Sequence, residues 1–127
     1  MTITDEYLEY QKKYEDIYGG RTIVLMQVGS FFEAYGVDNE NENCNADNLN
    51  HLSDILNIQK TKKNKNILEI SRKNPLMIGV PTWSIDKYTQ ILTNHNFTIV
   101  MIEQISEPPN CKRGVTNIIS PGTNIEV

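Results

Sequence analysis

The segment Gln27–Tyr35 places an aromatic ring and a carboxyl group where the two could act together. It predicts the end of a buried strand, a break at Gly29 that lets another backbone come close, and a short second strand with alternating apolar and polar residues. Because side chains alternate between the two faces of a strand, Phe31 and Phe32 must point in opposite directions, and Glu33 shares the face of Phe31. The alternative is that both phenylalanines belong to the core and Glu33 is a solvated charge.

The sequence lacks the motifs that usually carry catalysis. It contains no GxxxxGKS/T phosphate loop, no GxGxxG after a strand, no HExxH, and no HxE paired with PCxxC. His51 and His95 occupy no recognisable nucleophile setting, and no short ligand spacing supports a zinc site at either residue. We therefore expect no catalytic residue, no metal site and no cofactor here. A small nuclease or another enzyme that uses the acidic loops stays open as an alternative function.

The charge of the chain argues against a free-standing DNA-binding protein. The formal net charge is −4, whereas such proteins usually carry a clear basic excess. The basic residues are nevertheless clustered, and the acidic residues gather in the first predicted helix and in 38–47, which allows the two signs to occupy different faces. The basic cluster comprises Lys60, Lys62, Lys63, Lys65, Arg72 and Lys73.

Length and composition predict one globular domain. With 127 residues, 39% of them hydrophobic, the chain can bury its own core but is too short for two domains. No apolar run is long enough to cross a membrane, and Met1–Glu6 has neither the basic start nor the apolar stretch of a signal peptide. Cys44 and Cys111 lie far apart without a CxxC motif, so we expect both to be reduced thiols of an intracellular protein.

The elements that position the Phe31 segment alternate between helices and strands. Thr4 is expected to cap a helix that ends at Tyr18 and packs through a stripe of tyrosines and Ile17. Ser84 is expected to cap a later helix, and Ala46 to Leu56 form another. The predicted strands are Thr22–Val28, Gly29–Tyr35, Leu76–Pro81, Phe97–Ile102 and Val115–Ser120, with a hairpin of Ile58–Lys62 and Ile67–Ser71 and a final turn at Pro121–Thr123. This order predicts an α/β domain with a mixed β-sheet flanked by helices.

Four segments resemble the amino-terminal mismatch-recognition domain of the MutS family of DNA mismatch-repair proteins. Val28–Glu33 is similar to the Gly-x-Phe-x-Glu element of that family, and Pro75–Pro81 to its Pro-Met-Ala-Gly-Ile-Pro segment. Ile99–Gln104 resembles a strand that ends in Glu-Gln, and Ile119–Thr123 resembles a closing Thr-Pro-Gly-Thr. The segments occur in family order and, with the first helix, cover almost the whole chain. We therefore expect residues 1–127 to form one MutS-like domain.

The resemblance implies that the domain recognises mispaired DNA from the minor groove. Phe31 matches the phenylalanine that family members push between bases, and Glu33 matches the carboxylate that contacts the displaced base. Either a protonated Glu33 donates to a purine ring nitrogen, or an ionised Glu33 accepts from a base N–H. Phe32 is expected to face the sheet core. Lys62 and Lys63 match a basic pair near the DNA backbone, which would hold position without reading sequence.

The resemblance also implies a larger parent protein. Family members carry clamp, lever and ATPase domains, so ATP and Mg²⁺ would bind outside this segment, and the parent would be a dimer. Its partner would be double-stranded DNA with mispairs or small loops. Ser30 and Thr82–Trp83 depart from common family residues without removing the wedge or the carboxylate. The competing hypothesis is a protein-interaction module of the same fold in a paralogue that does not read mismatches.

Overall fold

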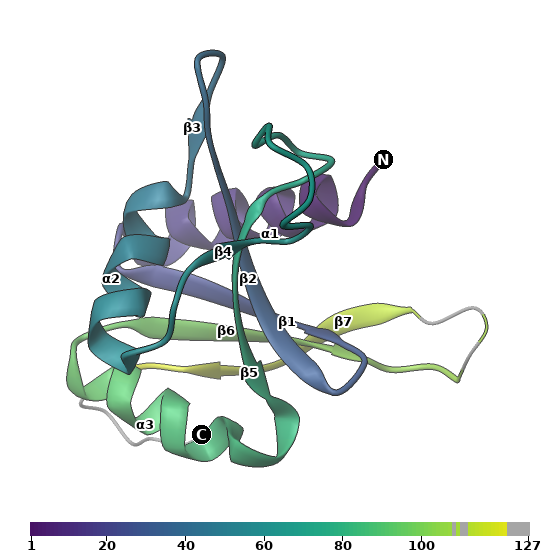
Figure 1. The fold of residues 1–127 in the computed structure, drawn as a ribbon. Helices are drawn as coiled ribbons and strands as arrows, with labels where there is room; N and C mark the ends of the chain where they lie inside the picture. Colours follow the sequence, from purple (N-terminus) through teal and green to yellow (C-terminus); the bar gives the residue numbers. More distant parts are fainter. Residues whose placement is uncertain (108, 110–111, 122–127) are drawn as a thin grey trace.

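The chain folds around one mixed β-sheet flanked by helices, which confirms the predicted α/β class (Figure 1). The computed structural model describes residues 1–107, 109 and 112–121. Within these ranges there are three α-helices and a seven-stranded sheet. The predicted thiol of Cys111 and most of the predicted turn at Pro121–Thr123 lie outside the described residues, whereas Cys44 is a free thiol.

The sheet combines antiparallel neighbours with one parallel pair. Its strand order is β4-β5-β2-β1-β6-β7, with β3 paired to β2. Only β1 and β6 run parallel among these pairs. The strands are β1 (Thr22–Val28), β2 (Phe31–Asp38), β3 (Asn43–Cys44), β4 (Thr61–Lys62), β5 (Leu76–Pro81), β6 (Thr98–Gln104) and β7 (Arg113–Ile119). The predicted central strands are therefore confirmed within a few residues.

Helix α1 (Ile3–Tyr18) covers one face of the sheet and begins earlier than predicted. Thr2, not Thr4, is the N-cap, because the Thr2 hydroxyl accepts from the Asp5 amide at 3.0 Å and the Asp5 carboxylate accepts from the Thr2 amide at 2.9 Å. Thr4 is instead buried. Tyr7 packs into the core as expected, whereas Ile17 is exposed and does not belong to the packing stripe.

Helices α2 (Ala46–Leu56) and α3 (Ile85–Asn94) cover the opposite face (Figure 1). A Cβ atom on Gly36 of β2 would lie 2.8 Å from the end of the Leu49 side chain of α2 and 3.1 Å from the Cys44 carbonyl oxygen, so glycine lets helix and strand pack closely there. Ser84 precedes α3 as predicted, but its hydroxyl donates to the Pro81 carbonyl at 3.2 Å and makes no cap hydrogen bond.

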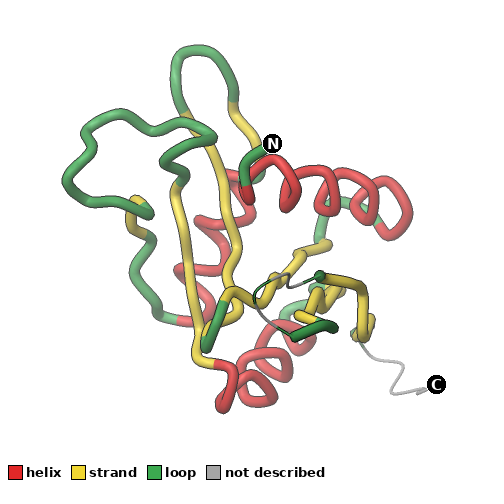
Figure 2. The backbone as a smooth tube through the Cα atoms, turned by 90° about the vertical axis from the view of Figure 1, so that its right-hand side faces the viewer, coloured by secondary structure: helices red, strands yellow, loops and turns green. Residues whose placement is uncertain are grey.

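The predicted hairpin of Ile58–Lys62 and Ile67–Ser71 is wrong. Strand β4 has two residues and pairs with the start of β5, while 63–75 form a long loop (Figure 2). The buried side chain of Asn74 holds this loop, because its amide donates to the carbonyls of Ile67 (3.2 Å) and Glu69 (2.9 Å). Its oxygen accepts from the Asn64 amide at 2.7 Å. These bonds satisfy backbone groups that a strand partner would otherwise pair.

Candidate nucleic-acid interface

A two-residue turn presents the start of β2 at one end of the sheet. Val28 and Phe31 are paired across the strands, so Gly29 and Ser30 form the whole connection. Gly29 has φ +61°, and glycine at the first central position suits the tight turns that follow the twist of a hairpin. The expected close approach of another backbone is wrong, since a Cβ on Gly29 would meet nothing within 4 Å. The glycine is needed for its backbone conformation.

Phe31 and Phe32 point to opposite faces of the sheet, as strand alternation predicts. Phe32 is buried on the α3 face, whereas Phe31 is 46% exposed on the face that carries α1. Glu33 lies on the face of Phe31: a Cβ on Gly79 of β5 would lie 3.9 Å from the Phe31 ring and 3.7 Å from Glu33 Cγ. The ring and the carboxyl group therefore both lie beside Gly79, which has no side chain.

The Glu33 carboxylate has a hydroxyl and an ammonium group as neighbours. The Tyr35 hydroxyl donates a hydrogen bond to Glu33 Oε1, and Lys63 Nζ lies 3.5 Å from the same oxygen. Lys63 Nζ also donates to the Tyr35 hydroxyl at 3.0 Å and lies 4.8 Å from the centre of the Tyr35 ring. The fold thus brings Glu33 and Tyr35 of β2 into contact with Lys63, the residue after β4.

Tyr35 is fixed by the core beneath it. Its ring is fully buried and packs edge-on against Tyr7 of α1, with ring centres 5.3 Å apart. The Asn45 amide donates to the Tyr35 carbonyl at 2.9 Å. Burial, and then the hydrogen bond to Glu33, raise the pKa of the Tyr35 hydroxyl well above its ordinary value. Tyr35 therefore keeps its proton and remains a donor to Glu33.

The two lysines named by the sequence lie in different environments. Lys63 contacts Glu33 and Tyr35, whereas Lys62 Nζ is 3.5 Å from the Leu68 carbonyl. Tyr35 was not predicted from the sequence as a neighbour of Glu33. The two-residue spacing between Glu33 and Tyr35 was the available signal, because it places both on one face of β2.

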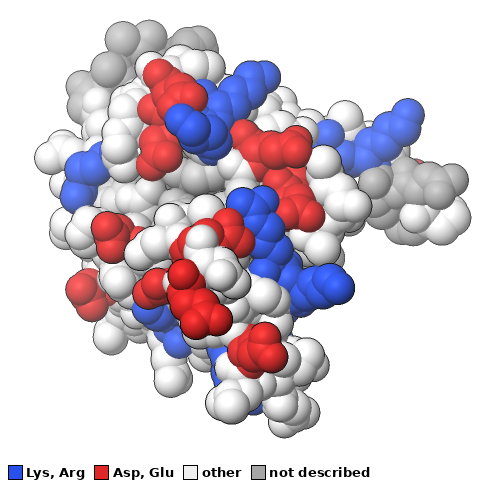
Figure 3. Space-filling view, turned by 90° about the horizontal axis from the view of Figure 1, so that it is seen from above, with Lys and Arg blue, Asp and Glu red and all other residues white. Residues whose placement is uncertain are grey.

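The basic cluster is only partly available to an anionic ligand. Arg72 forms ion pairs with Asp5 and Glu42, each at 3.0 Å. The backbone amide of Thr2, and then Arg72, lower the pKa of Asp5, whereas Arg72, and then the Cys44 thiol, lower the pKa of Glu42. Figure 3 shows Lys and Arg beside Asp and Glu on the face seen from above. The two signs are therefore mixed on this face.

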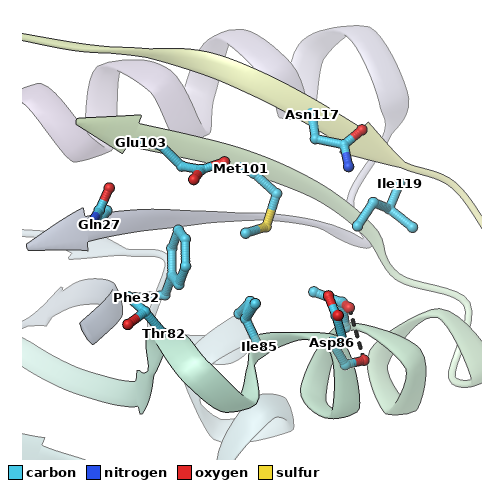
Figure 4. Close-up of a pocket in the computed structure, with 10 residues that line it drawn as sticks. Gln27, Phe32, Thr82, Ile85, Asp86, Met101, Glu103, Asn117 and Ile119 are labelled. Carbon is cyan, nitrogen blue, oxygen red and sulfur yellow. Dashed lines mark hydrogen bonds between the residues drawn. The ribbon is translucent and has the colours of Figure 1, made fainter. Parts of the chain in front are cut away.

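A pocket lies on the other face of the sheet, between α3 and strands β1, β6 and β7. Phe32, Ile85 and Met101 contribute apolar surface, and Glu103 and Asn117 contribute polar groups (Figure 4). The pocket is bounded in part by Phe32, whose ring points away from Phe31. It is therefore separate from the surface that carries Phe31 and Glu33.

Neither a membrane span nor a metal cluster is found in the described ranges. No helix there combines the length and the apolar character needed to cross a bilayer. The same residues contain no group of three or more His, Cys, Asp or Glu side chains arranged to hold a metal ion.

Comparison with known proteins gives one family. The family model described as MutS domain I matches residues 2–127. A mutS homolog of Acanthamoeba polyphaga mimivirus is 33% identical over 123 residues, covering 96% of this chain and 11% of the relative. The DNA mismatch repair proteins MutS of Fervidobacterium nodosum and Streptococcus gordonii are 31% and 29% identical, covering 95% of this chain and 12% of each relative. The chain thus spans 11–12% of the length of these relatives.

Proposed function

Because the chain belongs to the MutS domain I family, which its four sequence motifs predicted, we propose that it reads mispaired DNA for mismatch repair. In this proposal Phe31 enters the base stack from the minor groove and Glu33 hydrogen-bonds the displaced base. Lys62 would lie near the phosphate backbone and hold the domain in position, whereas Lys63, which the sequence groups with it, lies beside Glu33.

The exposed ring of Phe31 is the observation that carries the proposal. Phe31 directly follows the two-residue turn, and 46% of its surface is exposed. Covering such a ring with a base would remove apolar surface from water, which is favourable. The strand beneath it is rigid, because β2 is paired on both sides by β1 and β5. Because the strand is held in place, the Phe31 ring can be inserted between two bases without the backbone moving away.

The wedge would select DNA by how easily its stack opens. Unstacking one base step costs a few kcal/mol, and the cost is lower where pairing or stacking is already poor. One ring can therefore test many kinds of mispair without reading base edges. Gly79 leaves space between the ring and the carboxyl group, so a base that Phe31 displaces would meet Glu33 directly.

The same proposal makes residues 1–127 one domain of a longer protein. The relatives are MutS proteins of which the chain spans 11–12%. The remaining domains would contribute clamping, dimer formation and an ATPase site that binds ATP and Mg²⁺. This domain itself would bind neither and would catalyse no reaction.

The test is replacement of Phe31 by alanine in the full-length protein. Stacking of a base on an aromatic ring contributes about 1 to 3 kcal/mol, so preference for a mispaired over a matched duplex should fall about 5- to 150-fold. Binding is measured by fluorescence anisotropy, with ATP hydrolysis as a check of the fold.

Tyr18→Ala is the matched control, because Tyr18 is 45% exposed at the end of α1, away from the turn. It should leave the preference unchanged. A Phe31→Ala protein that still prefers the mispair would refute the wedge and would favour the protein-interaction module.

A further inference from the structure

The contact between Lys63 and Glu33 is not explained by a lysine that binds phosphate. Lys63 Nζ lies 3.5 Å from Glu33 Oε1 and 3.0 Å from the Tyr35 hydroxyl, while Lys62, one residue earlier, lies 3.5 Å from the Leu68 carbonyl. The Lys63 side chain is 36% exposed and the Glu33 side chain 12%. The ammonium group of Lys63 therefore lies beside the carboxyl group that would meet the displaced base, although its side chain is accessible to solvent.

The chemistry of the three groups fixes the direction of their hydrogen bonds. An ammonium group only donates, and a phenol has a single hydrogen to donate. Lys63 must therefore donate to the Tyr35 oxygen, and Tyr35 must use its hydrogen on Glu33 Oε1. This oxygen of Glu33 is consequently an acceptor, and the carboxylate charge lies beside the positive charge of Lys63.

The arrangement is built into the fold. The Tyr35 ring is locked against Tyr7, and the Lys63 amide donates to the Pro75 carbonyl at 2.9 Å. Strand β5 lies between β4 and β2, because Met77 of β5 pairs with Thr61 on one side and with Tyr35 on the other. Lys63, which follows β4, therefore reaches Tyr35 across β5. A base would meet a carboxylate whose orientation is already set.

We infer that Lys63 is a positioning residue which, through Tyr35, holds Glu33 as a hydrogen-bond acceptor. The site would then favour a displaced base with a ring N–H, such as thymine or guanine, over one with only a bare ring nitrogen. This inference rests on the proposed function. It selects one of the two roles that the sequence left open for Glu33.

The experiment uses full-length protein and duplexes with one unpaired base, so that the displaced base is unambiguous. Unpaired thymine is compared with N3-methylthymine, which lacks the ring N–H, and unpaired adenine with 7-deazaadenine, which lacks the N7 acceptor. A hydrogen bond to a charged group predicts that N3-methylation weakens binding roughly tenfold or more, and that the 7-deaza change has less than about a twofold effect. A tenfold loss with 7-deazaadenine would overturn the inference, because it would make Glu33 a donor.

Variants test whether Lys63 positions Glu33 or binds phosphate, and whether the N3-methyl group acts by removing a hydrogen bond or by a steric clash. Lys63→Met and Tyr35→Phe should each reduce the N3-methyl effect to about twofold, and Lys63→Arg should restore it. Lys62→Met is the control, and it should weaken binding to all duplexes alike while keeping the N3-methyl effect. If Lys63→Met behaves as Lys62→Met does, the inference is wrong. Phe31→Ala, measured under the same conditions, tests the proposed function separately. If it loses the preference for the mispair, the proposed function stands even when the inference about Lys63 fails.

Discussion

At the scale of single residues, the neighbours of Glu33 explain how a carboxylate can lie on a surface proposed to meet DNA. An isolated carboxylate is repelled by phosphates, and the repulsion is weakened when a cation lies close to it. Lys63 supplies that cation at 3.5 Å, with both side chains partly exposed. In the proposed function, this neighbouring positive charge is what allows Glu33 to lie close to DNA.

Replacing Glu33 by glutamine should separate affinity from discrimination. The amide still fits beside Tyr35, but the negative charge is lost and Lys63 becomes free to contact phosphate. We expect affinity for a matched duplex to rise a few-fold, roughly what one additional phosphate contact gives, and preference for a mispair to fall. Both are measured by anisotropy in the full-length protein.

Asp54→Asn is the control for Glu33→Gln, because it removes one carboxylate from an exposed position on α2, on the opposite face of the sheet. It should change neither quantity appreciably. An equal rise in matched-duplex affinity for both variants would show that only the net charge matters.

Strand alternation was enough to predict which way the site residues point. A period of two placed Phe31 and Glu33 together and Phe32 opposite them, and the structure has this arrangement. The contact of Lys63 with Glu33 could not be predicted, because the two residues are 30 positions apart in the sequence. Their meeting depends on the two-residue strand β4, which carries almost no sequence signal.

At the scale of elements, the turn between β1 and β2 determines where the Phe31 ring lies. Gly29 has φ +61°, and a side chain in this conformation costs about 1 to 2 kcal/mol. Gly29→Ala should therefore lower the free energy of unfolding by about that amount, although nothing lies within 4 Å of the added methyl group. Urea unfolding measures the loss. Gly20→Ala is the control, because it is equally open and has no positive φ, and equal stability of the two variants would contradict the prediction.

The start of α1 should make the stability of the protein depend on pH. The backbone amide of Thr2, and then Arg72, lower the pKa of Asp5 from 3.8 to about 2. A carboxyl group whose pKa is lower in the folded state stabilises the fold when ionised, so its contribution is complete above pH 3.8 and is lost as the pH falls towards about 2.

The urea concentration at the midpoint of unfolding should fall when the pH is lowered through this range. The fall should be smaller for Asp5→Asn than for the unchanged protein. Glu42, whose pKa Arg72 also lowers, accounts for part of the fall that remains. Asp16→Asn alters an exposed carboxylate at the other end of the same helix and should retain the full acid dependence. An identical fall in both variants would mean that the N-terminal network does not stabilise the fold.

Long elements were predicted from the sequence, whereas the connection between α2 and β5 was not. Continuous apolar runs identify β1 and β6, and the spacing of apolar residues identifies α2. Short apolar stretches in 58–71 predicted a hairpin, but 63–75 form a loop. Its structure depends instead on one buried amide, Asn74, whose partners lie five to ten residues away. No periodic pattern reveals such a residue.

At the scale of the whole molecule, charge limits what this domain can do alone. The net charge is −4, and Arg72, one of the clustered basic residues, is already paired with two carboxylates. Lys63 is also engaged with Glu33. Few cations of the basic cluster therefore remain to contact phosphates. Release of counterions by such contacts is the main source of DNA affinity that does not depend on sequence. Tight binding should require the rest of a longer protein.

A salt titration of the 127-residue chain on matched and mispaired duplexes tests this conclusion. With only a few phosphate contacts, the logarithm of the binding constant should fall with the logarithm of salt concentration with a slope of roughly −2 to −4, and Kd at physiological salt should be about 10⁻⁵ M or weaker. Lys62→Met should make the slope shallower by about one, since it removes one phosphate contact. Nanomolar binding by the isolated chain at physiological salt would contradict the prediction, because the free cations of this surface could not supply it. The full-length protein, measured in parallel, should bind more tightly and show a steeper slope, because its other domains would add contacts to the DNA backbone.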